Sequence, residues 1–357
     1  MATNAGFKNY TEFRFAQLGR FDYTPQDCKR YQEAVDKVVV PALRELRETR
    51  RRRLGLETLR PYDWDVSLFG AAPAQIFKDQ DGFVALVDRI FASVDPVFAR
   101  DFDILVRNGL LDLMSRPGKA PGGYNCPVED IGLPFIFYNA VGRRADLRVL
   151  LHEGGHAFHT LAVRDIQIQP YRSAPTEFCE VASMAMELFG FERLAGILDE
   201  GEVREFTYGQ FAGIVMVICY VAVVDAFQAW MYEHPQHTRE ERCTKWVELS
   251  DRFLGGFDWT GLEQFRESGW QRIPHLFGHP LYFIEYGIAQ IGALQLWRKE
   301  RADHDGAVAG YRCALALGGS RSLPELFEAA GIRFAMDEDI LSDVVPDVME
   351  KLRGLVA

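Results

Sequence analysis

Apolar residues recur every three or four positions along most of this chain, which is the spacing of helices that bury one face. The pattern is clear between residues 8 and 60, where it is carried by Val35, Val38, Val39, Val40, Leu43 and Leu46. Thr24 before Pro25 predicts a helix start, because threonine caps the first turn and proline suits its first position. Further helices are predicted at 81–93, 95–103, 143–163, 173–189, 201–232, 239–255, 259–270, 281–302, 305–317, 322–329 and 337–354.

Two stretches depart from the helical pattern. Leu133–Asn139 is short, aromatic and bounded by turn residues, which predicts a strand. Arg116–Cys126 is rich in glycine and proline and predicts irregular backbone. That loop is either a surface turn or a place where backbone approaches a ligand. We therefore expect a mainly α fold with a small β element, as a single unit over residues 1–357: helices in 1–115, loop, strand and two helices in 116–190, and helices in 191–357.

Composition and charge narrow the class of protein. The chain of 357 residues is 48% hydrophobic and 25% charged, as globular proteins are, and its net charge of -11 argues against a nucleic-acid partner. The longest apolar run, Phe211–Val224, is shorter than the ~20 residues that span a bilayer, so it predicts a buried helix and no membrane partner. The six cysteines form no C-x-x-C pair, and the N-terminus has no apolar leader. Both features predict a cytoplasmic protein with reduced thiols.

The chemistry concentrates in the predicted helix 143–163, which contains His152-Glu153-Gly154-Gly155-His156. Residues four apart project from one helix face, so the two imidazoles can hold one zinc ion. The glutamate between them can then act as general base on a zinc-bound water, which would be the nucleophile. The alternative is chance occurrence of the pentapeptide on an ordinary helix.

A catalytic zinc has three protein ligands, so a third must come from elsewhere. Position 162, where one known arrangement has a histidine, is Ala162, and His159 lies only three residues past His156. Glu180, on the next predicted helix, fits the arrangement in which a downstream glutamate completes the site. We expect one Zn²⁺ per chain, held by His152, His156 and Glu180. Glu187, two turns after Glu180, either orients a ligand histidine or makes a peripheral salt bridge.

A transition state with an oxyanion also needs hydrogen-bond donors. The richest remaining cluster of donors is the segment 275–287, with His275, His279, Tyr282 and Tyr286. We predict that the tyrosines are catalytic rather than mere packing groups at the rim of a helix.

These segments together resemble the M3 zinc oligopeptidases, and most closely their oligoendopeptidase F branch. The likeness runs in order through the loop Arg116–Tyr124, the motif His152–His159, the helix Glu177–Glu187, the segment Val224–Trp230 and the segment His275–Gln295. It implies a zincin-type helical metallopeptidase with a small β element beside the H-E-x-x-H helix and a deep cleft with zinc at its floor. Relative to typical members, we expect a short form that lacks the N-terminal helical region.

The resemblance implies a zinc-dependent endopeptidase that cleaves short oligopeptides, with zinc on His152, His156 and Glu180 and with Glu153 as base. It also implies that a histidine and two tyrosines stabilise the transition state. We favour His275 over His279, together with Tyr282 and Tyr286. Two other functions stay open: an inactive peptide-binding protein descended from such an enzyme, and a zinc hydrolase of non-peptide amides. The partners expected are short peptides and, if the protein assembles, a second copy in a homodimer.

Overall fold

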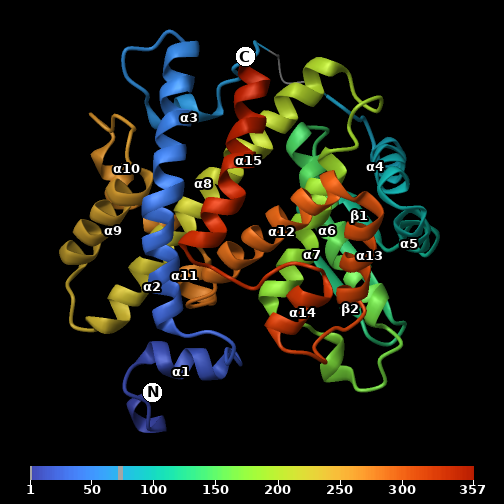
Figure 1. The fold of residues 1–357 in the computed structure, drawn as a ribbon, viewed down its shortest axis with the longest axis horizontal. Helices are drawn as coiled ribbons and strands as arrows, with labels where there is room; N and C mark the ends of the chain where they lie inside the picture. The colour runs from blue at the N-terminus through green and yellow to red at the C-terminus, as the bar shows by residue number, and fades with distance from the viewer. Residues whose placement is uncertain (1, 71–74) are drawn as a thin grey trace. The chain divides into compact units, whose positions relative to one another are not determined.

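A computed structural model describes residues 2–70 and 75–357 of the chain. The protein is mainly helical with one small sheet, which confirms the predicted fold class (Figure 1). Its described residues group into two compact units. The first unit comprises Met1–Leu68, Tyr208–Ile291 and Ala335–Ala357, and the second comprises Phe69–Thr207 and Gly292–Phe334.

The first unit is helical. It contains α1 (Tyr10–Gln17), α2 (Pro25–Ala34), α3 (Val40–Arg53), α9 (Arg239–Leu254), α10 (Glu263–Glu267), α11 (His275–Gly278), α15 (Glu338–Val356), most of α8 (Glu200–Glu233) and the start of α12 (Ile284–Ala302). Thr24 caps α2 as predicted, since its side chain accepts a hydrogen bond from the backbone N–H of Asp27. A π-helical segment, Val35–Val39, leads into α3. Pro41 lacks the N–H that would continue the regular register there.

Helix α8 carries the longest apolar run of the chain. Within the described residues it is the one helix whose length and composition would suffice to cross a membrane, but 67% of its most apolar window is buried inside the protein. Asp225 and Gln228, near its C-terminal end, are also buried. We interpret α8 as a core helix, as the sequence predicted.

The second unit contains the sheet and the helices around it. These are α4 (Gln80–Val94), α5 (Pro96–Arg107), β1 (Leu111–Met114), β2 (Tyr124–Val128), β3 (Leu133–Ala140), α6 (Arg144–Val163), α7 (Thr176–Phe191), the end of α12, α13 (His304–Leu315) and α14 (Leu323–Ala329). The strand order is β1-β3-β2, with β1 parallel and β2 antiparallel to the central β3. The predicted strand is therefore β3, and the sequence analysis missed β1 and β2.

The glycine-rich loop before β2 is fastened to β3. The side-chain amide of Asn139 donates hydrogen bonds to the backbone oxygens of Ala120 and Gly122, at 2.8 and 2.9 Å. A Cβ on Gly123 would lie only 2.7 Å from the ring of Tyr138, so only glycine fits this close approach. The loop is therefore held beside the strand that packs on α6.

Helices α6 and α7 form the closest helix pair of the second unit. A Cβ on Gly155 would lie 2.5 Å from the backbone oxygen of Ala182 in α7, so glycine allows the two backbones to approach. The buried hydroxyl of Tyr311 in α13 donates a hydrogen bond to the same oxygen, at 2.7 Å. Apolar rings also pack against α6, where Phe158 contacts Phe91 and Phe98. The position of α6 is thus fixed by a close backbone approach and by ring packing.

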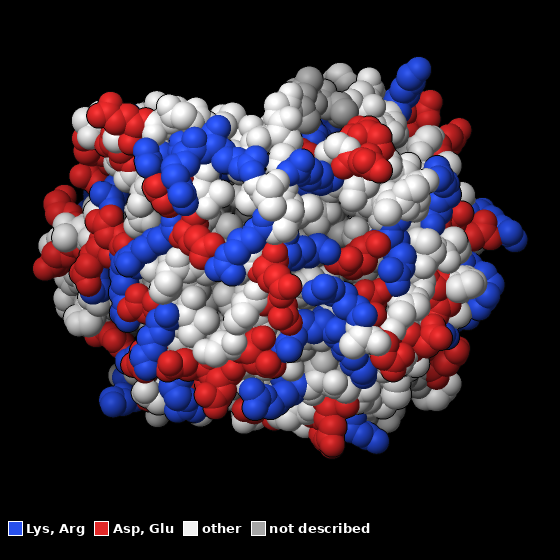
Figure 2. Space-filling model, turned by 45° about the horizontal axis from the view of Figure 1, so that its top comes forward, with Lys and Arg blue, Asp and Glu red and all other residues white. Residues whose placement is uncertain are grey.

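Charged side chains on the face drawn in Figure 2 are mixed in sign. Figure 2 shows Lys and Arg interspersed with Asp and Glu over the face drawn, and the described residues there form no extended basic patch.

Candidate metal centre

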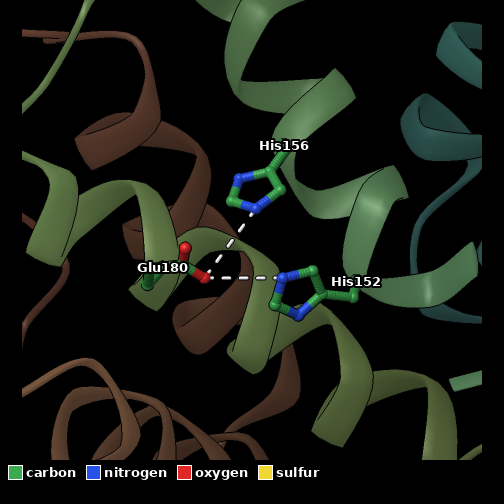
Figure 3. Close-up of side chains that lie close together, drawn as sticks. All are labelled: His152, His156 and Glu180. Carbon is green, nitrogen blue, oxygen red and sulfur yellow. Dashed lines mark ion pairs between the residues drawn. The ribbon is translucent and has the colours of Figure 1, made fainter. Parts of the chain in front are cut away.

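Three side chains from α6 and α7 converge on one point (Figure 3). His152 and His156 project from one face of α6, and Glu180 faces them from α7. One oxygen of Glu180, Oε2, lies 3.4 Å from Nε2 of His152 and 3.8 Å from Nε2 of His156. One potential ligand atom from each of the three residues lies within 4.8 Å of the others. The structure therefore brings together the three residues that the sequence analysis selected.

Hydrogen bonds hold two of these side chains in place. Oε1 of Glu187 lies 2.7 Å from Nδ1 of His152, which leaves Nε2 of the same ring facing Glu180. The hydroxyl of Ser183 donates a hydrogen bond to Oε2 of Glu180, at 3.1 Å. Glu187 thus contacts a histidine of the cluster, as one of the two sequence hypotheses predicted.

The electrostatics of the cluster suit a cation. Burial lowers the pKa of His152, but hydrogen bonds and charge from Glu180 and Glu187 outweigh burial and raise it to about 10. Burial lowers the pKa of His156 to about 4, so this ring is neutral at pH 7. The cluster therefore has one neutral imidazole and two carboxylates that attract positive charge to His152.

Glu153 faces a different environment. It is 7% exposed, and its Oε2 is a buried atom that accepts no hydrogen bond from the described residues. Burial raises the pKa of Glu153 to about 7, with the charges of Glu180 and Glu187 acting in the same direction. A carboxyl group whose pKa lies near 7 can both accept and release a proton at neutral pH.

The donor set can be tested against the metal that the motif predicts. Zinc takes imidazole nitrogen and carboxylate oxygen, and its catalytic sites have three protein ligands. His152, His156 and Glu180 supply two nitrogens and one oxygen, and the negative charge of the surrounding carboxylates favours a divalent cation. His159 is not part of the cluster; its ring is buried and lies 6.4 Å from that of Phe178. The residues present therefore fit a zinc ion.

The predicted donor segment lies in the first unit. Oη of Tyr286 lies 3.4 Å from Nε2 of His275, and the ring centroid of Tyr282 is 5.6 Å from that of His275 and 5.1 Å from that of Tyr286. His279 contacts Tyr282, with centroids 6.1 Å apart. The structure thus brings His275, Tyr282 and Tyr286 into one cluster.

The backbone just before Tyr282 is unusual. Leu281 has a φ of 62°, in the left-handed region that branched or bulky side chains rarely adopt. Its N–H donates a hydrogen bond to the buried side chain of Gln228, at 3.0 Å. Strained backbone of this kind persists where the surrounding structure determines it, and it occurs often at functional sites.

Two residues beside the metal cluster were missed by the sequence analysis. Ser183 bonds Glu180, and Arg148 lies 3.6 Å from Oε2 of Glu187. Arg148 precedes His152 by four residues and so shares its face of α6. That spacing was the available signal, and nothing in the sequence identified Glu187 as its partner.

A mainly helical fold with H-E-x-x-H on one helix and a glutamate facing it from the next is the arrangement of a helical protein with a candidate metal centre of the H-E-x-x-H class. The sequence matches the family described as Peptidase family M3 over residues 1–345, and the chain belongs to that family. This finding confirms the resemblance that the sequence motifs suggested.

Solved structures agree with the family. The chain is similar to PZ peptidase A solved with an inhibitor, with 30% identity and a TM-score of 0.93 over 99% of this chain and 63% of that one. It is similar to a protein described as an oligoendopeptidase F, with 31% identity and a TM-score of 0.92 over 99% of this chain and 62% of that one. A third, described as an oligoendopeptidase F from Bacillus anthracis, has 30% identity and a TM-score of 0.87 over 99% and 60% of the two chains.

The chain therefore spans less than two thirds of the length of these three structures. No curated protein matches it.

Proposed function

We propose that the protein is a zinc-dependent endopeptidase that hydrolyses peptide bonds in short oligopeptides. The observation that carries this proposal is the convergence of His152, His156 and Glu180, with Glu153 buried beside them. Membership of Peptidase family M3 supports peptide hydrolysis as the reaction. The names of the similar structures, oligoendopeptidase F and PZ peptidase, support short peptides as substrates.

In the proposed mechanism His152, His156 and Glu180 hold one zinc ion per chain. When bound, zinc acts as a Lewis acid and lowers the pKa of a coordinated water from 15.7 to about 7. The carboxylate of Glu153 accepts a proton from the attacking water and delivers it to the nitrogen of the leaving amine. Burial raises the pKa of the Glu153 carboxyl, which favours its uptake of the proton. Glu187 keeps the ring of His152 oriented through Nδ1.

His275, Tyr282 and Tyr286 are the proposed donors to the oxyanion of the transition state. Their mutual contacts support a shared role. The phenol of Tyr286 supplies an O–H donor that phenylalanine lacks. Replacement of Tyr286 by phenylalanine should lower kcat about 100-fold or more with little change in KM, as removal of an oxyanion donor does elsewhere. Equal kcat values for the two proteins would exclude this role.

The test of the main proposal is the variant Glu153→Gln. It should retain zinc, measured by atomic absorption, and lose turnover of a quenched fluorogenic oligopeptide. Glu350→Gln, the same change at an exposed position on α15, is the matched control and should keep full turnover. Turnover that persists in Glu153→Gln would contradict the proposed role of Glu153 as general base. A wild-type protein that binds peptides without cleaving them would favour the inactive peptide-binding alternative, and cleavage of acyl-amino acids in place of peptides would favour the non-peptide amide hydrolase.

We also propose a cytoplasmic location and, if the protein assembles, a homodimer, with no nucleic-acid or membrane partner. Among the described residues, no disulfide joins any of the six cysteines, which suits a reducing compartment. Cell fractionation checks the location, and light scattering of the purified protein checks the oligomeric state. Recovery in the membrane fraction would contradict the proposed location.

A further inference from the structure

A groove of about 430 Å³ runs along α6 in the second unit. We call it the α6 groove. It is lined by Gly122, Gly123, Tyr138, Asn139, Arg148, Val149, His152 and Glu153. Two members of the H-E-x-x-H motif therefore share a surface with the glycine-rich loop and with the end of β3.

Arg148 is the one lysine or arginine among the described residues that line the α6 groove. Its side chain is 48% exposed. It stands one helical turn before His152, so it is near enough to the motif to contact the same bound molecule. A half-exposed cation in a groove attracts an anionic ligand.

The guanidinium of Arg148 has more N–H donors than its one described ion pair uses. A guanidinium has five N–H groups. Its one described ion pair is to Glu187, where Nη1 and Oε2 are 3.6 Å apart, which is too long for a good hydrogen bond. Glu187 directs its other oxygen to His152, at 2.7 Å. The short contact of Glu187 is therefore with the histidine, and Arg148 can bind a second carboxylate.

We propose that Arg148 binds a carboxylate of the peptide that occupies the α6 groove, and so makes the protein selective for peptides that present a carboxylate at this position. The planar fork of arginine matches the two oxygens of a carboxylate, which favours this anion over neutral groups. The carboxylate is either the C-terminus of the peptide or an aspartate or glutamate side chain. This inference rests on the proposed peptidase function and names the substrate class of the same site.

Equilibrium binding tests the proposal without requiring turnover. Fluorescently labelled peptides are titrated into the Glu153→Gln protein loaded with zinc, and anisotropy gives the Kd. One peptide has a free C-terminus and no acidic residue, a second has an amidated C-terminus and one glutamate, and a third is amidated with glutamine in place of the glutamate. We expect the first or the second to bind about tenfold more tightly than the third, the size of one charge-assisted hydrogen bond. Whichever binds tightly identifies the source of the carboxylate.

Variants at position 148 then test whether Arg148 causes this preference for a peptide carboxylate. Arg148→Gln should remove it, and Arg148→Glu should reverse it in favour of a peptide with lysine in place of the glutamate. The matched control is Arg107→Glu, which changes the net charge equally at a side chain 78% exposed on α5 and outside the groove lining. It should leave the preference intact.

Three results would overturn the proposal. First, the preference for the carboxylate could persist in Arg148→Glu. Second, Arg148→Gln could bind all three peptides more weakly by the same factor. Third, Arg148→Gln could lose zinc along with the preference. The last would show that Arg148 acts only by positioning Glu187. Cleavage of the same peptides by the wild-type protein is a separate measurement. Cleavage without charge preference refutes the role of Arg148 alone, whereas charge-dependent binding without cleavage refutes the peptidase function alone.

Discussion

Oε1 of Glu187 lies 2.7 Å from Nδ1 of His152, so a buried carboxylate on α7 sets the orientation of an imidazole on α6. Carboxylates in this position usually fix the tautomer of a metal-ligating histidine and increase its basicity. Because Nδ1 is engaged by Glu187, Nε2 is the nitrogen that is left to bind a metal. The orientation of the candidate ligand His152 on α6 therefore depends on Glu187 of α7.

Loss of this carboxylate should weaken zinc binding. We predict that Glu187→Ala lowers zinc affinity about 10- to 100-fold, the usual cost of losing such a partner. Glu187→Gln, which keeps a neutral hydrogen-bonding group, should have a smaller effect. Competition with a chromogenic chelator measures both affinities. An affinity equal to that of the wild type in Glu187→Ala would show that the contact does not support the metal site.

The third ligand can be assigned by metal content. Glu180→Ala should contain much less zinc than the wild type after dialysis, because two imidazoles alone do not complete a zinc site. His159→Leu should retain its zinc, since His159 is absent from the cluster and lies beside Phe178. The opposite pattern, with zinc kept in Glu180→Ala and lost in His159→Leu, would show that His159 and not Glu180 is the third ligand.

The close approach of α6 to α7 predicts a packing effect. Gly155→Ala would place a methyl group 2.5 Å from the backbone oxygen of Ala182, so it should destabilise the fold by about 1–3 kcal/mol through overpacking. Gly209→Ala is the control, because its Cβ meets nothing within 4 Å and α8 gains helix propensity. Urea denaturation measures both variants. A Gly155→Ala protein as stable as Gly209→Ala would mean that the helices separate without cost.

A buried carboxyl in the first unit predicts how stability depends on pH. Burial raises the pKa of Asp225 from 3.8 to about 6, despite a hydrogen bond from Gln32 at 2.8 Å. A group whose pKa is raised by folding binds more protons in the folded state, so its contribution to stability is full below pH 4 and is lost as pH rises through 6. The loss amounts to about 3 kcal/mol for a shift of this size.

Asp225→Asn removes this titration. Relative to the wild type, the variant should gain stability as pH rises from 4 to 6 and then hold a constant advantage. Urea denaturation of both proteins at several pH values gives the difference, in which the other titrating groups cancel. A difference that does not change between pH 4 and pH 7 would contradict the pKa of Asp225.

The metal motif was predictable because its spacing is local. His152 and His156 are four residues apart on one helix, and any α-helix places such residues on one face. Glu180 was found by its position on the following helix. The contacts of Ser183 and Arg148 were not found, because they depend on how α6 and α7 are packed, and packing is not encoded in spacing along one helix.

The two outer strands of the sheet were missed for a related reason. Strand β1 has only four residues, and β2 includes Pro127, which cannot donate to a ladder. Each is stabilised by pairing with β3, which is distant from β1 in the sequence. Two of the four boundaries between the two units could not be predicted from the sequence, since they fall within the continuous helices α8 and α12 and no linker marks them.

The chain of contacts from Arg148 through Glu187 to His152 has a thermodynamic consequence. A peptide carboxylate that draws Arg148 away would remove a positive charge from beside Glu187, so Glu187 should make His152 more basic and strengthen its binding of zinc. Linkage is reciprocal, and zinc must then raise the affinity for the peptide that carries this carboxylate by the same factor. Zinc affinity measured with and without a saturating concentration of that peptide tests this, and equal values would show that the two binding events are independent. The effect of the peptide on zinc affinity and the effect of zinc on peptide affinity would then be equal, because both measure the same coupling free energy.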